Sequence, residues 1–163
     1  VGGFGNSRFS SGDDVFLMLR IRKIFGSRAI RFLKSREAIV HTEAKKNIAE
    51  FFQQRTRWAS KNKGYEINIL LVSFTVYMVN LLILAGMVRV FIEPLWYPVL
   101  LTILVIKVLI DLPIVMGIGK FVKRPGIIIF SIPLVVLYPI YIVLIGALGI
   151  LGNYNWKGRK VKN

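Results

Sequence analysis

The chain has 163 residues, of which 55% are hydrophobic, and its formal net charge is +15. Its mean hydropathy of +0.59 is too apolar for an ordinary soluble domain and indicates membrane spans. Because the sequence contains no cysteine and a single histidine, it excludes disulfides, thiolate metal sites and multi-histidine metal sites within these residues.

Positive charge is spread over both parts of the chain. Residues 1–66 hold 14 Lys and Arg against 6 Asp and Glu, and residues 67–163 hold 9 against 2. Basic charge beside apolar spans is typical of contact with anionic lipid and of the positive-inside bias. Nucleic-acid binding is the competing interpretation, but the long apolar runs argue against it. We therefore expect a lipid bilayer as partner and no nucleic acid.

The N-terminal part predicts a loop followed by a helix. Residues 1–12 are rich in Gly and Ser. They begin without Met, so we expect the C-terminal piece of a longer protein. From Asp13 apolar residues recur at helical spacing, and Gly26 is a natural stop. Residues 29–42 alternate loosely between apolar and polar and suggest one or two short strands.

Two acidic residues stand at the start of this first helix, at Asp13 and Asp14. A carboxylate at a loop-to-helix junction can point into a cleft and act as a general base. The alternative is purely structural, because acidic groups are favoured at a helix N-terminus.

A second helix is predicted from about residue 47 to residue 61, with Asn47 and Glu50 forming a capping-box pattern. Gln54, Arg57 and Trp58 then lie near one face. Arginine binds diphosphate oxygens in a bidentate manner, glutamine can donate to phosphate or sugar hydroxyls, and tryptophan offers a flat face to a sugar ring. The alternative is a membrane-surface helix, where Trp and Arg are common anchors.

Three apolar stretches follow, at about residues 67–88, 95–119 and 127–151, and each is long enough to cross a bilayer as a helix. The second stretch contains Lys107 and Asp111, which we expect to form an ion pair because they are one helical turn apart.

The charges leave the topology of the third stretch open. If residues 127–151 cross completely, the basic tail lies on the face opposite the soluble part. If they bend at Pro133 or Pro139 as a re-entrant segment, the tail returns, and protein must shield the bend.

The motifs resemble those of membrane-integrated family 2 glycosyltransferases, the group that includes cellulose, chitin and hyaluronan synthases. Residues 2–4 (Gly-Gly-Phe) and 11–18 (Ser-Gly-Asp-Asp-Val-Phe-Leu-Met) resemble the segment carrying the catalytic base of that family. Residues 54–58 (Gln-Arg-Thr-Arg-Trp) resemble its Gln-x-x-Arg-Trp motif. The resemblance covers essentially the whole chain.

The resemblance implies a role for each residue. Asp14 matches the base that deprotonates the acceptor hydroxyl, and Asp13 matches the acidic residue before it. Gln54 and Arg57 match residues near the donor diphosphate, and Trp58 matches the residue that stacks on the acceptor sugar. No metal ligand is assigned within this chain. The divalent cation of the family, Mg or Mn, would have its ligands outside it, in an upstream Asp-x-Asp motif.

The resemblance also implies an architecture. Residues 1–64 would form an α/β fragment, the C-terminal part of a GT-A-type nucleotide-sugar transferase domain. Residues 65–163 would form an all-α transmembrane region of about three helices with a basic tail. Because the metal motif would lie upstream, we expect the isolated chain to be inactive.

The expected function is that of an inverting glycosyltransferase. It would move a sugar from a nucleotide-sugar donor to a hydroxyl of a lipid-linked or growing glycan. The catalytic part would face the cytoplasm at the inner membrane of a bacterium. Two alternatives remain open at this point: a non-catalytic scaffold or glycan-translocating subunit that keeps the fold, and a basic membrane-surface binding module.

Overall fold

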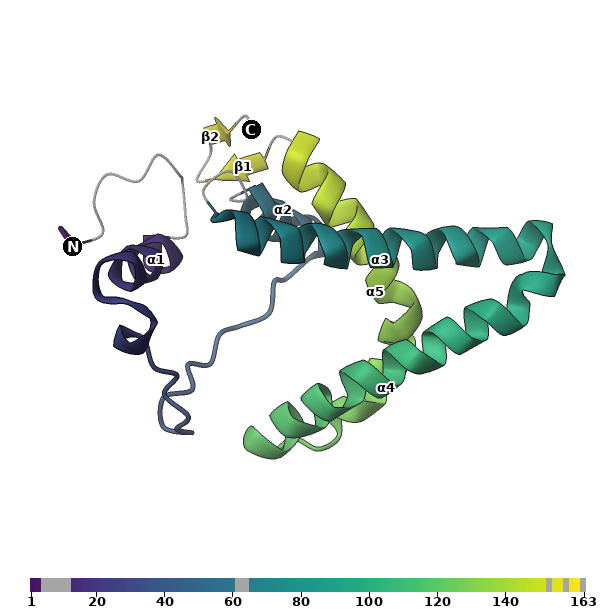
Figure 1. Cartoon of the computed structure of the whole chain (residues 1–163), viewed down its shortest axis with the longest axis horizontal. Helices are drawn as coiled ribbons and strands as arrows, with labels where there is room; N and C mark the ends of the chain where they lie inside the picture. The colour runs from purple at the N-terminus through teal and green to yellow at the C-terminus, as the bar shows by residue number, and fades with distance from the viewer. Residues whose placement is uncertain (4–12, 61–64, 152–153, 157–158, 162–163) are drawn as a thin grey trace. The chain divides into compact units, whose positions relative to one another are not determined.

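The computed structural model describes residues 1–3, 13–60, 65–151, 154–156 and 159–161, the last two ranges for their backbone alone. Over these residues the regular secondary structure is helical apart from one short antiparallel hairpin (Figure 1). It divides into two compact units. Unit 1 comprises residues 1–66 together with residues 147–163, and unit 2 comprises residues 67–146.

The first helix of unit 1, α1, spans Asp13–Phe25 and confirms the predicted start and stop. Asp13 and Asp14 occupy its first turn, and Arg22 and Lys23 its last, so both ends complement the helix dipole. Gly26 follows with a φ of +80°, which favours glycine, and its N–H donates to the Arg22 carbonyl at 2.8 Å.

The strands predicted within residues 29–42 do not form, so the α/β assignment for residues 1–64 is wrong. After the short 3₁₀ helix η1 (Ser27–Ala29), the chain continues through bends and turns to residue 47. Phe32, Leu33 and Val40 are more than 70% exposed. A strand needs a neighbouring strand to accept its hydrogen bonds, and the described residues provide none here.

The second helix, α2, spans Ile48–Ala59 and begins at the predicted cap. The Asn47 side-chain oxygen accepts from the Glu50 backbone N–H at 2.8 Å. The Asn47 amide donates to the Glu50 carboxylate, also at 2.8 Å. The cap is thus reciprocal and satisfies a helix donor that would otherwise lack a partner.

Unit 2 contains the predicted apolar helices. α3 spans Ile67–Ile92, the 3₁₀ turn η3 spans Pro94–Trp96, and α4 spans Tyr97–Phe121. These segments form a hairpin of two long helices (Figure 1). α5 spans Ile127–Leu151, and its last five residues belong to unit 1. All three helices are long and apolar enough to cross a membrane, as the sequence predicted.

Most apolar side chains of these helices face outward. Phe91 is 89% exposed and Ile92 is 71% exposed, whereas only a few residues of unit 2, such as Ile83 and Ile145, are buried. An apolar surface of this extent requires an apolar environment, which a lipid bilayer provides. The chain is therefore a membrane protein.

Glycine permits one close helix contact inside unit 2. A Cβ built on Gly146 of α5 would lie 2.5 Å from the Tyr77 ring of α3, closer than side-chain atoms approach. Small residues of this kind allow membrane helices to pack tightly.

The C-terminal residues of unit 1 pack against α2. Strands β1 (Tyr154–Trp156) and β2 (Arg159–Val161) pair antiparallel, with Asn155 opposite Lys160, and β1 lies against α2. At the end of α5, Gly149 is buried, and a Cβ built on it would lie 2.5 Å from the Ala59 Cβ. The last turn of α5 therefore packs closely against the last turn of α2.

We expect Gly149→Ala to destabilise the protein by about 1–3 kcal/mol, because the added methyl overlaps Ala59. Thermal unfolding in detergent measures the effect, and a second change, Ala59→Gly, should recover part of the loss.

Gly117→Ala is the matched control, since nothing lies within 4 Å of a Cβ at this helical position. It should leave stability unchanged or raise it, because alanine favours helix more than glycine does. An unchanged unfolding temperature in Gly149→Ala would mean that α5 and α2 do not meet as described.

Candidate functional site

The last two turns of α2 present the three side chains that the sequence singled out. Trp58 is 42% exposed, and Gln54 and Arg57 are half-buried. Thr56, by contrast, is 5% exposed and marks the packed side of the helix. Their spacing places Gln54, Arg57 and Trp58 along one face, within reach of a common ligand.

Arg55, which sequence reasoning left without a role, organises this face. Its guanidinium carbon lies 4.6 Å from the Trp58 ring centroid and 5.0 Å from that of Phe51. Phe51, Arg55 and Trp58 therefore form a stack along the helix in which the cation meets two aromatic faces. The stack holds the indole of Trp58 in one orientation and leaves part of it exposed.

The start of α1 carries the acidic pair, and both Asp13 and Asp14 are exposed there. The neighbour of Asp14 is Tyr65, which precedes α3. Burial raises the pKa of the Tyr65 phenol, and the nearby Asp14 carboxylate raises that pKa further. The Tyr65 ring also packs on Phe16 of α1, with 6.1 Å between ring centroids. Tyr65 thus contacts the first turn of α1.

The structure places Gln54, Arg57 and Trp58 near one another on α2. It places Asp14 near Tyr65. Among the described residues, no ion pair joins Asp14 to Arg57. Both parts of the predicted site lie in unit 1, and Tyr65 is a described neighbour of Asp14.

The described residues do not fit a divalent cation, because no three acidic or histidine side chains gather within those ranges. The ligands that the resemblance implies would come from residues outside it.

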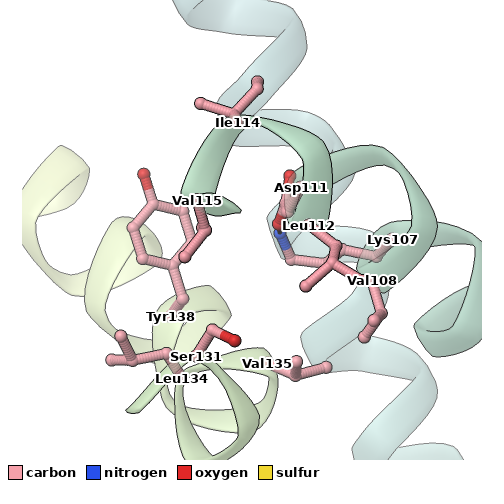
Figure 2. Close-up of a pocket in the computed structure, with 10 residues that line it drawn as sticks. All are labelled: Lys107, Val108, Asp111, Leu112, Ile114, Val115, Ser131, Leu134, Val135 and Tyr138. Carbon is pink, nitrogen blue, oxygen red and sulfur yellow. Dashed lines mark hydrogen bonds and ion pairs between the residues drawn. The ribbon is translucent and has the colours of Figure 1, made fainter. Parts of the chain in front are cut away.

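A second polar cluster lies inside unit 2. A groove of about 270 Å³ runs between α4 and α5, and Figure 2 shows the side chains that line it. Its wall is mostly aliphatic. The polar groups that line it are Lys107, Asp111, Ser131 and Tyr138.

The predicted pair of Lys107 and Asp111 is confirmed in this groove. The Lys107 ammonium donates to the Asp111 carboxylate at 2.5 Å and lies 5.2 Å from the centroid of the Tyr138 ring. The lysine side chain is 16% exposed and the aspartate side chain 52%. Each charge would be costly alone in hydrocarbon, and together they are neutral.

Sequence reasoning missed Arg55 and Tyr65 for different reasons. Arg55 follows Phe51 by four residues and precedes Trp58 by three, so helical spacing alone predicts the stack. Tyr65 meets Asp14 across the whole of α1, the connecting segment and α2. No local pattern indicates such a contact.

Comparison with known proteins adds nothing to the resemblance: no family model, curated protein or solved structure matches this chain. The roles of Asp14, Gln54, Arg57 and Trp58 remain predictions.

The raised pKa of Tyr65 predicts a loss of stability in alkali. In the unfolded chain the phenol ionises near its ordinary pKa of about 10, whereas the folded protein holds the proton to higher pH. The stabilising contribution is therefore complete below pH 10 and is lost as the pH rises through the folded pKa. Between about pH 9 and about pH 11, Tyr65→Phe should lose less stability than the wild type.

Thermal unfolding in detergent at the two pH values measures this difference. Asp14→Asn should also lose less than the wild type, because the carboxylate no longer opposes ionisation of Tyr65. Asp13→Asn serves as the neighbouring control and should behave as the wild type does. Equal alkaline losses in the wild type and Tyr65→Phe would contradict the assignment.

The Lys107–Asp111 pair predicts non-additive stabilities. Lys107→Met or Asp111→Leu alone leaves one unpaired charge in the membrane, at a cost of about 2.5–3.5 kcal/mol on insertion scales. The double variant should therefore be more stable than either single variant. A double-mutant cycle on thermal stability in detergent measures the coupling.

The same cycle at Arg89 and Glu93 is the matched control. This pair has the same spacing, with 2.8 Å between Arg89 Nη2 and Glu93 Oε1, but both side chains are about half exposed at the end of α3. Its coupling should stay below about 1 kcal/mol. Strictly additive losses at Lys107 and Asp111 would rule out their pairing.

Proposed function

We propose that the membrane protein containing this chain is an inverting glycosyltransferase, acting on a nucleotide-sugar donor and a hydroxyl acceptor at the membrane surface. One observation carries the proposal. The end of α2 presents Gln54, Arg57 and Trp58 along one face, with the Trp58 ring held by Arg55. A helix that only anchors to a membrane does not require these three chemistries together.

The donor is proposed to bind through its diphosphate. A guanidinium pairs with phosphate oxygens at two points, so Arg57 would neutralise the charge that grows on the leaving nucleoside diphosphate. Gln54, one turn before Trp58 on the same face, would donate to a phosphate or sugar oxygen. Arg55 is already engaged with two aromatic rings and is not assigned to the phosphate.

The acceptor sugar is proposed to stack on Trp58. The exposed part of this indole offers a flat apolar face, and the Phe51–Arg55–Trp58 stack fixes its orientation before the sugar arrives. A preordered ring lowers the entropic cost of binding.

Asp14 is proposed as the general base. It would accept the proton of the acceptor hydroxyl as that oxygen attacks the anomeric carbon of the donor. The new carbon–oxygen bond forms while the bond to the nucleoside diphosphate breaks, and the diphosphate leaves with the bonding electron pair. A single displacement of this kind inverts the anomeric configuration. The exposure of Asp14 leaves it open to an acceptor.

The proposed location is the cytoplasmic face of a bacterial inner membrane. An acceptor that is lipid-linked or a growing glycan would suit a protein whose helices lie in the bilayer. The support for this face is the excess of basic residues before α3, which the positive-inside bias assigns to the cytoplasm.

The test is sugar transfer by the full-length protein with Asp14→Asn. We expect turnover to fall by about 10²–10⁴-fold, because the amide cannot take the proton. Donor affinity, measured by calorimetry with the nucleoside diphosphate, should remain. Near-normal turnover would remove Asp14 from the mechanism.

Two further variants separate donor binding from a loss of folding. Arg57→Ala should weaken nucleoside-diphosphate binding, whereas Gln53→Ala, an exposed neighbour on the same helix, should not. Unchanged nucleotide affinity in Arg57→Ala would require another role for this arginine.

A further inference from the structure

We infer that the turn between α3 and α4 binds a membrane phospholipid whose head group carries both a phosphate and a primary ammonium, that is, a phospholipid of the ethanolamine class. The inference concerns the hairpin of unit 2 and does not depend on the proposed function. It starts from a second groove, which has a volume of about 420 Å³ and lies between these two helices.

This groove is polar at one end and apolar along the rest of its length. Arg89 and Trp96 line it beside the turn, and the other side chains that line it are aliphatic, down to Leu82 on α3 and Ile103 on α4. Leu82 and Ile103 each lie seven residues from the polar end, which is about 10 Å along a helix. A ligand that fills the groove therefore needs a polar group at one end and a hydrocarbon chain behind it.

The polar end lies where the head groups of a bilayer lie. α3 and α4 are each long and apolar enough to cross the membrane, so the turn that joins them is at a membrane surface. Tryptophan beside an arginine is typical of that depth. The groove therefore opens at head-group level and runs toward the acyl chains, which is the direction in which a phospholipid lies.

Three side chains at the turn form one cluster with an exposed charge of each sign. Arg89 Nη2 donates to Glu93 Oε1 at 2.8 Å, and the Trp96 indole N–H donates to Glu93 Oε2 at 2.9 Å. The guanidinium carbon of Arg89 lies 5.5 Å from the centroid of the Trp96 ring. The side chains of Arg89 and Glu93 are 51% and 49% exposed, so each charge keeps a side open to a ligand.

The charges of this cluster select the head group. The Arg89 guanidinium can donate to a phosphate, and the Glu93 carboxylate can accept from an ammonium close to that phosphate. A glycerol head group is purely anionic, so Glu93 would oppose it. A choline head group has a cation without an N–H donor. An ethanolamine head group supplies both the anion and a cation with N–H donors.

The absence of a side chain at Gly86 leaves room for the hydrocarbon chain. A Cβ built there would lie 3.5 Å from Leu100 Cδ1, which is ordinary van der Waals contact. Alanine therefore fits at this position, whereas a larger side chain would extend into the groove.

Tryptophan fluorescence with brominated lipids tests the inference, because bromine on an acyl chain quenches an indole that it touches. The chain has three tryptophans, and Trp58→Phe with Trp156→Phe leaves Trp96 as the reporter. The protein is reconstituted in vesicles of equal parts phosphatidylethanolamine and phosphatidylglycerol. The bromine is carried by one lipid or by the other, so the composition of the bilayer stays the same.

We expect bromine on phosphatidylethanolamine to quench Trp96 more, with an occupancy ratio of about threefold to tenfold, the range that one or two partly exposed charge contacts produce. The matched control moves the reporter to Phe91→Trp in a Trp96→Phe background. Phe91 is 89% exposed and does not line the groove, so both labelled lipids should quench it equally. Equal quenching of Trp96 by the two lipids, or stronger quenching by phosphatidylglycerol, would overturn the inference.

Two variants then separate the head group from the chain. Glu93→Gln leaves the charge of Arg89 uncompensated and should shift the preference toward phosphatidylglycerol. Gly86→Leu fills the groove and should lower the quenching of Trp96 by both lipids. Each variant is first checked for the unfolding temperature of its parent. If Gly86→Leu fails that check, Gly86→Ala replaces it and should lower the quenching less. An unchanged preference in Glu93→Gln would contradict the head-group assignment.

Discussion

Backbone hydrogen bonding in hydrocarbon is the constraint on which this molecule depends. A peptide group that meets lipid has no water to bind, so its N–H and C=O must pair within the protein. α3, α4 and α5 meet this requirement along their length, and their outward apolar side chains meet lipid. Of the two prolines inside α5, Pro139 is buried and Pro133 is exposed.

The same constraint explains how charge is distributed along unit 2. Lys107 and Asp111 lie well inside α4, where an ion pair and a tyrosine ring replace water as their environment. Arg89 and Glu93 have the same spacing at the end of α3, and there Glu93 also accepts from the Trp96 indole at 2.9 Å. The same spacing of four residues therefore has a different role in each pair. The inner pair neutralises charge in hydrocarbon, and the outer cluster anchors a turn where water is available.

The candidate site combines local order with a distant contact. The Asn47 cap and the Phe51–Arg55–Trp58 stack each join residues three or four apart in and beside α2, so both are local to this helix. Asp14 is different, because its described neighbour Tyr65 is far away along the chain. A glycosyltransferase site of the proposed kind requires two features. The side chains of α2 must recognise the donor and the acceptor, and the general base must be brought close to them by tertiary structure.

The sequence by itself determined the features that rest on short spacings: α1 and its stop at Gly26, the cap of α2, the three apolar helices, and the pair of Lys107 and Asp111. Each depends on residues three or four apart, or on a long run of apolar residues, and both are visible in a linear chain. The strands predicted within residues 29–42 failed because alternation shows only that a strand can form, while its partner has to come from elsewhere. Tertiary structure alone decided that Tyr65 meets Asp14, that β1 lies on α2 and that Gly149 fits against Ala59. These contacts join segments far apart in the sequence, and the free energy that selects them comes from packing, which no local pattern encodes.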